Sequence, residues 1–280
     1  MSEIVNVIVR AGTACDNLFK NFGREPLVKS PDNPIPVPEV SQAITFENVF
    51  FAYQPHQPVV KKVSLVVPAG QTLAIVGGNG SGKSTLMNLL ARFYDPHLGR
   101  ILYDGKDIRQ ANPKQVRKQL AWVTQDSVLF NGTLWDNVAY GKPDATDEEI
   151  LAAIKIAHVD RFLAELPAGY ETNVGDEGTN LSAGQCQRVA IARAVVSDPK
   201  ILILDEATSQ IDGFSESQIH LSLAEFIKGR TTFIVTHRPS SLKLADRVIV
   251  MELGEIVHDS SVADANKNSE QFQSLFARSA

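Results

Sequence analysis

Short runs of consecutive apolar residues recur along this chain, separated by longer segments in which apolar and polar residues mix. Three such runs, at 72–77, 201–207 and 231–237, are short enough to be strands. Unbroken apolar runs of this length are typical of strands buried on both faces of a parallel sheet. Two earlier segments, 43–53 and 61–67, also have the composition of strands. The pattern therefore predicts a sheet with a fully buried centre.

Helical patterns fill intervals between the predicted strands. The segment 83–95 directly follows the first buried run, and residues 144–197 are almost wholly helical in pattern. Alternation of strands with helices predicts an α/β fold with a mostly parallel sheet. Because the second helical stretch lies between two core strands, we expect it to form an inserted helical subdomain.

The N-terminal part, 1–42, differs in pattern from the rest. Residues 1–24 place apolar side chains on one face of a predicted helix, at Ile4, Val5, Ile8, Ala11, Ala14, Leu18, Phe19 and Phe22. The stretch 29–40 contains four prolines, which forbid a helix and favour an extended linker. We therefore expect a folded domain over 43–280, and we expect the linker to transmit little order from this domain to residues 1–24. A helix docked as an integral part of that domain is the alternative.

Composition and charge limit the classes of function. The chain has 280 residues and a net charge of −5, so it lacks the excess positive charge with which nucleic-acid binders neutralise phosphates. We expect no nucleic-acid partner. No uninterrupted apolar run reaches the length of about 18 residues that a membrane-spanning helix needs. Cys15 and Cys186 stand far apart with no metal-binding pattern around them, so we expect two reduced thiols.

A glycine-rich segment, GGNGSGKS at 77–84, fits the pattern G-x-x-x-x-G-K-[ST] between a predicted strand and a predicted helix. Its glycines let successive backbone N–H groups point at one anion, and the helix N-terminus adds its positive end. We expect Lys83 to reach the β- and γ-phosphates of a nucleotide and the Ser84 hydroxyl to bind Mg²⁺. A turn that merely caps the helix is the alternative. The predicted phosphate site comprises Gly77, Gly78, Asn79, Gly80, Ser81, Gly82, Lys83, Ser84 and Thr85.

Two consecutive acids lie within the run at 201–207, directly after its first four residues, which are apolar. The first, Asp205, is expected at the carboxyl edge of the sheet, where ligands of α/β proteins bind. Together with Ser84 and the phosphates it would supply the oxygen ligands that Mg²⁺ needs. The second, Glu206, points elsewhere and can accept a proton from an attacking water molecule. Acidic residues often occur at strand ends, so the pair alone is weak evidence for a magnesium and water-activating site. Together with the glycine-rich loop at 77–84 it becomes strong evidence.

Further along, LSAGQ at 181–185 leads directly into CQRVAIARAVVSDP, and this stretch resembles the signature motif of ABC ATPases, usually written LSGGQ. Other family landmarks occur in the family's order: Tyr53, Gln125, SQID at 209–212, and His237. The resemblance covers roughly residues 43–260. It implies a P-loop NTPase core with an antiparallel β subdomain on its N-terminal side.

The resemblance also implies roles for the matched residues. Tyr53 would stack on adenine, Gln125 would touch Mg²⁺ or the attacking water, and His237 would hold the γ-phosphate and orient that water with Glu206. Neither site would be complete in one chain, because a second copy or a paralogous ATPase domain would add its own groups from the opposite side. The groups acting on the partner's ATP would be Leu181, Ser182, Ala183, Gly184, Gln185 and Asp212.

Segments outside these motifs indicate a branch of the family. The stretches at 129–141 and 172–178 resemble parts of ABC exporters, and 11–26 resembles the chain just after an exporter's last transmembrane helix. The implied partner is a transmembrane domain, covalently linked or separate, and the implied location is the cytoplasmic face of a membrane. The isolated chain would be soluble. An importer ATPase, a soluble ABC ATPase and a catalytically silent regulatory module are the alternatives.

Two departures from the family pattern bear on these expectations. Ala183 replaces a glycine where backbone would approach a phosphate, and alanine adopts a positive φ only at a cost, so we expect a weakened dimer. Asp176 and Glu177 occupy a loop that is commonly written with an arginine, which changes the charge offered to a transmembrane domain.

Overall fold

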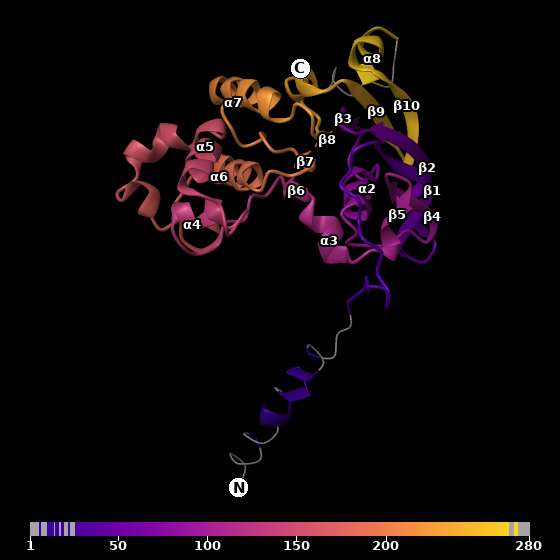
Figure 1. Cartoon of the computed structure of the whole chain (residues 1–280), viewed down its shortest axis with the longest axis horizontal. Helices are drawn as coiled ribbons and strands as arrows, with labels where there is room; N and C mark the ends of the chain where they lie inside the picture. The colour runs from indigo at the N-terminus through magenta and orange to yellow at the C-terminus, as the bar shows by residue number, and fades with distance from the viewer. Residues whose placement is uncertain are drawn as a thin grey trace.

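The computed structural model describes residues 26–268 together with residues 6, 10–13, 15, 16, 18, 19, 22, 272 and 273. The described residues between 6 and 22 are helical and exposed, and Phe19 and Phe22 leave 75% and 84% of their surface open. Figure 1 shows them on a segment that projects from the domain. The rest of the helix expected over 1–24 lies outside the described residues. No helix in the described part of the chain is both long and apolar enough to cross a membrane.

Ten strands alternate with helices along the described chain. The strands are β1 (Ala43–Gln54), β2 (Gln57–Pro68), β3 (Thr72–Val76), β4 (Leu98–Tyr103), β5 (Lys106–Asp107), β6 (Leu120–Val123), β7 (Ile201–Asp205), β8 (Thr231–Val235), β9 (Arg247–Glu252) and β10 (Glu255–Ser261). The α-helices are α2 (Lys83–Leu90), α3 (Pro113–Lys118), α4 (Leu134–Ala139), α5 (Asp147–Ile156), α6 (Ala183–Val196), α7 (Gly213–Phe226) and α8 (Val262–Asn268). Short 3₁₀ helices are η1 (Ile108–Gln110), η2 (Val159–Glu165), η3 (Gly169–Glu171), η4 (Asp176–Gly178) and η5 (Ser241–Leu244).

The central sheet has six strands in the order β10-β9-β3-β8-β7-β6. All neighbouring pairs are parallel except β10 with β9. Every residue of β3 and of β8 is buried, because other elements cover both faces of the sheet. The three short apolar runs at 72–77, 201–207 and 231–237 therefore contain strands β3, β7 and β8. The predicted α/β class with a mostly parallel sheet is confirmed.

A second sheet, in the order β2-β1-β4-β5, is antiparallel throughout. In β2 the buried residues alternate with exposed ones from Val63 to Val67, as expected for a strand with one face on the core. Figure 1 shows this sheet at the end of the molecule opposite the helices α4 and α5. The expected antiparallel subdomain is thus present on the N-terminal side.

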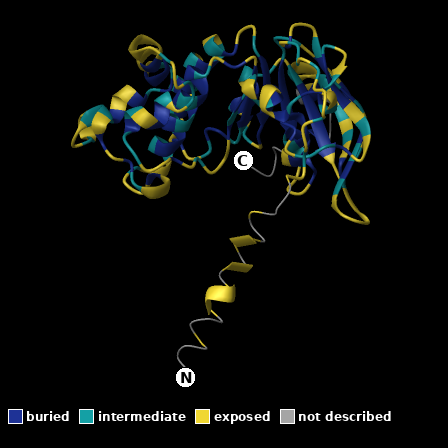
Figure 2. Cartoon of the chain, turned by 60° about the horizontal axis from the view of Figure 1, so that its bottom comes forward, coloured by how far each residue is buried: buried dark blue, intermediate teal, exposed yellow. Residues whose placement is uncertain are grey.

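The inserted helices α4, α5 and α6 lie between β6 and β7 and share an apolar core that Figure 2 shows as buried. A threonine precedes each of the helices α4 and α5 as its N-cap residue, Thr133 and Thr146, and forms a reciprocal capping box. We expected helical structure from about residue 144, and the structure adds α4 ahead of that point. The hydrophobic pattern did not reveal α4 because the helix has only six residues.

Helix α2 ends at Leu90, although the sequence pattern predicted a helix over 83–95. Arg92 adopts a positive φ of 52°, which is incompatible with continuing the helix. Its side chain is 2% exposed and donates hydrogen bonds to Asp95 at 2.9 Å, to the Ala111 carbonyl, and to the Lys29 carbonyl at 3.2 Å. These partners hold a buried charge in place and so end the helix.

The proline-rich linker is attached to the domain at several points. The Ile35 N–H donates to the Gln110 carbonyl at 2.9 Å, and the Gln119 side chain donates to the Pro38 carbonyl at 3.0 Å. Val40 is 8% exposed, and Ile35 and Val37 pack against the core beneath the antiparallel sheet. Residues 35–40 therefore pack on the domain, although the sequence pattern placed the start of the domain near residue 43. The prolines keep the linker extended, and its apolar residues Ile35, Val37 and Val40 pack against the apolar core of the domain.

We predict that the linker contributes measurably to stability. A chain that begins at residue 42 should melt below a chain that begins at residue 26, because it loses the burial of Ile35, Val37 and Val40. Partial burial of three such side chains is worth about 2–4 kcal/mol, which lowers the melting temperature of a domain this size by roughly 5–10 °C. Differential scanning calorimetry of both chains measures the difference. Equal melting temperatures would mean that the linker contacts contribute nothing.

Candidate functional site

The glycine-rich loop connects β3 to α2 and has little room for side chains at two positions. At Gly77, with a φ of 152°, an added Cβ would lie 2.2 Å from the Met251 carbonyl oxygen. At Gly82, with a φ of 101°, it would lie 2.7 Å from the Val59 carbonyl oxygen. Only glycine tolerates this combination of positive φ and close backbone contact. The loop residues 78–80 are exposed, so their backbone is open to a ligand.

Lys83 begins α2 and folds its ammonium group back over the loop. Its Nζ donates to the carbonyl oxygens of Gly77 and Gly78, each at 2.9 Å, and lies 3.4 Å from the Ser81 hydroxyl. Burial lowers the pKa of Lys83, while the charges of Glu206 and Asp205 oppose that shift. A cation is thus held inside the loop by neutral carbonyls, where a phosphate would be a stronger partner.

Asp205 is the last residue of β7, and its carboxylate lies near the side chain of Ser84 in α2. Burial raises the pKa of Asp205 to about 6, and the neighbouring Glu206 adds to this shift, while Lys83 and the Ser84 side chain oppose it. Two of the three predicted magnesium ligands therefore meet. The third, Gln125, is exposed in the turn after β6, the strand beside β7. Among the described residues, it makes no hydrogen bond with either of them.

Glu206 and His237 form the contact that the sequence analysis assigned to water activation. The Glu206 Oε1 lies 2.9 Å from the His237 Nδ1, and the imidazole is 58% exposed. Glu206 has a positive φ of 50°, a conformation that costs about 1–3 kcal/mol for a residue other than glycine. Its N–H donates to the Val235 carbonyl at 2.9 Å, which anchors the acid to the end of β8. This backbone turns Glu206 away from Asp205 and toward His237.

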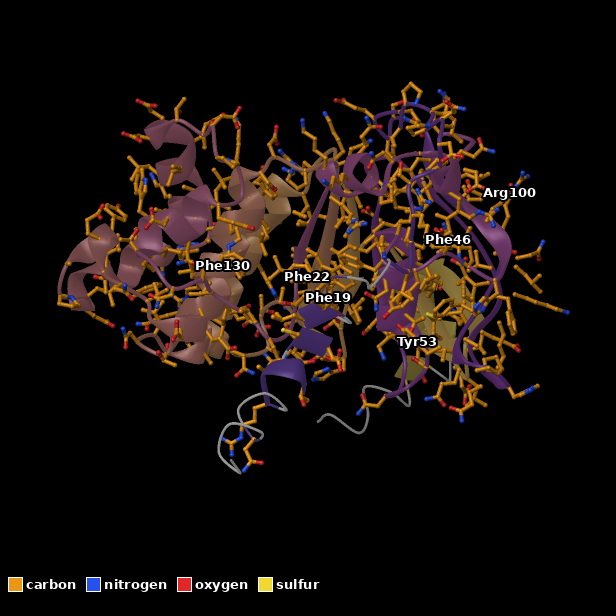
Figure 3. All side chains as sticks on the ribbon, turned by 90° about the horizontal axis from the view of Figure 1, so that it is seen from below. Phe19, Phe22, Phe46, Tyr53, Arg100 and Phe130 are labelled. Carbon is orange, nitrogen blue, oxygen red and sulfur yellow. The ribbon has the colours of Figure 1, made fainter. Side chains whose placement is uncertain are left out.

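Tyr53 lies at the end of β1 with 47% of its surface exposed (Figure 3). Its hydroxyl donates to the Thr85 hydroxyl at 3.3 Å, so the ring is tied to the helix that follows the phosphate loop. Phe51 and Tyr94 meet the ring edge-on, with centroids 4.9 and 5.1 Å away. Leu27 and Val28, which directly precede the linker, complete a groove of about 270 Å³ beside the ring. Tyr53 is therefore a fixed aromatic surface next to the loop.

The segment 181–185 lies at the start of α6, and Figure 1 shows α6 separated from α2 by β6 and β7. Ser182 caps the helix: its hydroxyl accepts from the Gln185 N–H at 3.3 Å, and the Gln185 side chain accepts from the Ser182 N–H at 2.9 Å. Ala183 is the first helical residue and has no positive φ. Its methyl group therefore requires no strained backbone in this chain, and the weakened dimer stays a prediction. Leu181 is half-buried, and Ser182 and Ala183 are exposed.

The loop after β7 ends at Asp212, which caps α7 by accepting from the Ser215 N–H at 3.0 Å. Asp212 is exposed, and its carboxylate lies 3.6 Å from the Arg188 guanidinium of α6. Gly184 faces the same loop, because a Cβ added there would lie 2.9 Å from the Gln210 carbonyl oxygen. The N-terminus of α6 and the loop 209–212 are thus one surface, and the predicted phosphate-binding residues of 77–85 are another.

Sequence reasoning missed a buried polar cluster behind His237. Arg238 donates to the Ser209 carbonyl at 2.9 Å and pairs with Glu216 at 3.4 Å. The Glu216 carboxylate accepts hydrogen bonds from the hydroxyls of Thr208, at 3.0 Å, and Ser240, at 3.1 Å. Burial lowers the pKa of His220, which lies 3.8 Å from Glu216. Only the position of Arg238 next to His237 offered a signal, since the partners lie far apart in the chain.

The arrangement combines an anion-binding loop, a cation, two oxygen donors and a carboxylate–imidazole pair at one edge of the sheet. Such a set can hold a phosphate group with a divalent cation and can deprotonate water beside it. Comparison with known proteins points the same way. The family model described as "ABC transporter" matches residues 60–209.

Individual relatives agree with the family match. The fatty acid ABC transporter ATP-binding/permease protein of Mycobacterium tuberculosis is 44% identical over 236 residues, which cover 84% of this chain and 37% of that protein. The ATP-dependent lipid A-core flippase of Desulfotalea psychrophila is 40% identical over 276 residues, covering 99% of this chain and 48% of that protein. A solved bacterial Atm1-family ABC exporter with ATP bound superposes with a TM-score of 0.90 at 38% identity, over 99% of this chain and 49% of that one. The chain spans less than half the length of these relatives.

The raised pKa of Asp205 predicts a pH-dependent effect of removing its charge. Between its ordinary value of 3.8 and about 6, the folded chain binds a proton that the unfolded chain releases. The free energy of unfolding therefore falls as pH rises through this interval. We expect Asp205→Asn, which abolishes that loss, to melt above the parent at pH 7.5 without nucleotide, and the difference to shrink toward pH 4. Thermal melts across pH 4–8 measure it, and a difference independent of pH would contradict the assignment.

Proposed function

The chain belongs to the ABC transporter family, and we propose that it is the ATP-hydrolysing domain of an exporter, which drives transport by a membrane domain. The observation that carries this proposal is the pairing of Glu206 with His237 at 2.9 Å, next to a loop built for phosphate. A catalytically silent module would have no need for a half-buried carboxylate held in a strained backbone conformation against an exposed imidazole. The relatives named above are transporters of which this chain matches one part.

In the proposed complex, ATP lies between Tyr53 and the loop 77–85. The exposed ring of Tyr53 stacks on adenine, a contact worth about 1–3 kcal/mol by analogy with base–aromatic stacking. Backbone N–H groups of the loop surround the β-phosphate, and the positive end of α2 adds to the attraction. The Lys83 ammonium exchanges its carbonyl partners for β- and γ-phosphate oxygens.

Mg²⁺ fits the oxygen donors at this site. The Ser84 hydroxyl and the Asp205 carboxylate lie near each other, and in the proposed complex Gln125 joins them directly or through water. In the described part of the chain, no three His, Cys, Asp or Glu side chains gather as a metal site, so the ion would rely on phosphate oxygens as well. When bound, the ion neutralises charge on the phosphates. A cation beside Asp205 would also favour its ionised form.

Hydrolysis is assigned to Glu206 and His237. Glu206 accepts a proton from the water molecule that attacks the γ-phosphate, and His237 contacts that phosphate while holding the carboxylate in position. The Val235 carbonyl accepts the Glu206 N–H at 2.9 Å and so holds one side of the Glu206 backbone. Asp205, turned the opposite way, remains with the metal.

The second half of each site comes from another chain in this proposal. The segment 181–185 is an exposed, capped helix N-terminus on a different surface from the loop of its own chain. Its partial positive charge suits the γ-phosphate of ATP bound to a second copy or to a paralogous domain. Two chains placed head-to-tail then complete both sites, with Leu181, Ser182, Ala183, Gly184, Gln185 and Asp212 acting in trans.

The membrane domain is proposed to contact the helical insert. Phe130 and Tyr140 are 48% and 63% exposed, and Figure 3 shows Phe130 on the opposite lobe from Tyr53. The Arg193 guanidinium lies over both rings, 5.1 and 5.9 Å from their centroids, and donates to the Val128 carbonyl at 3.1 Å. These aromatic rings are thus rigidly presented to a partner. In this proposal the chain works at the cytoplasmic face of a membrane, joined to its transmembrane partner covalently or not.

Replacing the proposed general base should separate binding from hydrolysis. We expect Glu206→Gln to lower steady-state ATP hydrolysis by roughly 10²- to 10⁴-fold, because the amide cannot accept a proton. ATP should still bind, and an ATP-bound dimer should accumulate and be detectable by light scattering. Wild-type turnover of this variant would exclude Glu206 as the base.

Lys83→Ala provides the contrast, because it removes the cation inside the loop. ATP affinity measured by calorimetry should fall by roughly 10- to 100-fold, the value of a charge-assisted hydrogen bond. No ATP-bound dimer should then form. Unchanged affinity in Lys83→Ala would show that ATP does not occupy the loop 77–84.

A further inference from the structure

Gln187 is a fully buried amide, 0% exposed, at the fifth position of α6. Its Nε2 donates to the carbonyl oxygen of Glu206 at 3.2 Å, and its Oε1 accepts from the N–H of Gln210 at 3.0 Å. The side chain thus joins α6 to the segment after β7 at two points. We infer that Gln187 is a positioning residue, which makes the orientation of Glu206 depend on the position of α6. The inference rests on the proposed role of Glu206 as general base.

The Glu206 backbone requires support because it is held at a positive φ of 50°. On one side, its N–H donates to the Val235 carbonyl at 2.9 Å. On the other side, its carbonyl accepts from the Ser209 N–H at 3.0 Å and from Gln187. Of these three hydrogen bonds, the one from Gln187 alone involves a residue outside the central sheet and the turn that follows β7. Without it, the Glu206 peptide can rotate, and the carboxylate then moves relative to His237.

The same helix carries the residues proposed to contact the partner's ATP. Ser182 and Gln185 cap α6 one turn before Gln187. Gly184 lies against the Gln210 carbonyl so closely that an added Cβ would be 2.9 Å from it. Helix α6 therefore contacts Gln210 at two points. Gly184 packs against the Gln210 carbonyl oxygen, and the Gln187 side chain accepts a hydrogen bond from the Gln210 N–H. A shift of the α6 N-terminus on meeting the partner's nucleotide is passed to Gln210 and to the Glu206 carbonyl together.

Through this connection, Gln187 makes hydrolysis depend on the preceding closure of the dimer. Glu206 is correctly oriented when α6 is seated on a nucleotide held by the other chain, so hydrolysis follows dimer closure. A purely structural role is the alternative, since any buried amide that satisfies two backbone groups stabilises a fold. The two roles differ in what they change: positioning alters the turnover number, and structure alters stability alone.

The test is the steady-state kinetics of Gln187→Met in the full chain, which keeps side-chain volume and removes both hydrogen bonds. We expect the turnover number to fall roughly 10- to 100-fold, as for a small misplacement of a catalytic group. KM and the calorimetric affinity for ATP should stay within about two-fold, because the loop 77–85 is untouched. The ATP-bound dimer should still form. Gln187→Asn, whose shorter amide cannot span both partners, carries the same test if the methionine variant does not fold.

Val189→Ala is the matched control, because Val189 is 0% exposed on the same helix and belongs to its apolar core. It should lower the melting temperature and leave the turnover number of the folded protein unchanged. A Gln187→Met turnover number equal to that of the parent would overturn the inference, as would an equal loss in Val189→Ala. A parent chain that neither binds nor hydrolyses ATP would instead refute the proposed function.

Discussion

The parallel pairing of β7 with β8 is the interaction on which the site depends. It sets Asp205 opposite Val235, and the next backbone hydrogen bond, from the Glu206 N–H to the Val235 carbonyl, turns the chain out of the sheet. From that turn the two acids diverge: Asp205 meets Ser84, and Glu206 meets His237. Strand β3 lies beside β8 and delivers the phosphate loop to the same edge. One ladder of parallel strands therefore aligns groups that lie far apart in the sequence.

Charge at this edge is incompletely compensated by the chain itself. Asp205 and Glu206 are adjacent acids, and the single ammonium of Lys83 sits nearby among carbonyl oxygens. Burial disfavours the charged forms of both Asp205 and Lys83. A phosphate with a divalent cation would relieve both penalties at once, since it offers an anion to the lysine and a cation to the acid. Binding of such a ligand is therefore coupled to the stability of the domain.

Much of this arrangement could be predicted from the sequence because it depends on local pattern. Consecutive apolar residues identified β3, β7 and β8, and the glycine pattern at 77–84 predicted the loop that connects β3 to α2. Contacts between distant segments left no such pattern. Gln187 with Glu206, and Arg238 with Glu216, became visible only in three dimensions.

Two features of the backbone have physical reasons that the sequence does not display. The linker has the prolines of an independent segment, yet Gln119 and Arg92 donate hydrogen bonds to its carbonyl groups and its apolar residues pack on the domain. Ala183 replaces a glycine of the family pattern, yet its position is the first turn of a helix, where alanine is favourable. In both cases the backbone conformation decided the outcome.

The central claim is that each active site is shared between two chains, and mixing two inactive chains tests it most directly. Lys83→Ala damages the phosphate loop, whereas Ala183→Asp places an acid on the exposed α6 N-terminus, where it favours the helix but repels the partner's γ-phosphate. Each homodimer then has two damaged sites. A dimer that pairs the two variants has one intact site of two, so ATPase activity should return in an equimolar mixture although neither variant is active alone. A mixture as inactive as its components, or an Ala183→Asp chain that turns over like the parent, would contradict the shared site.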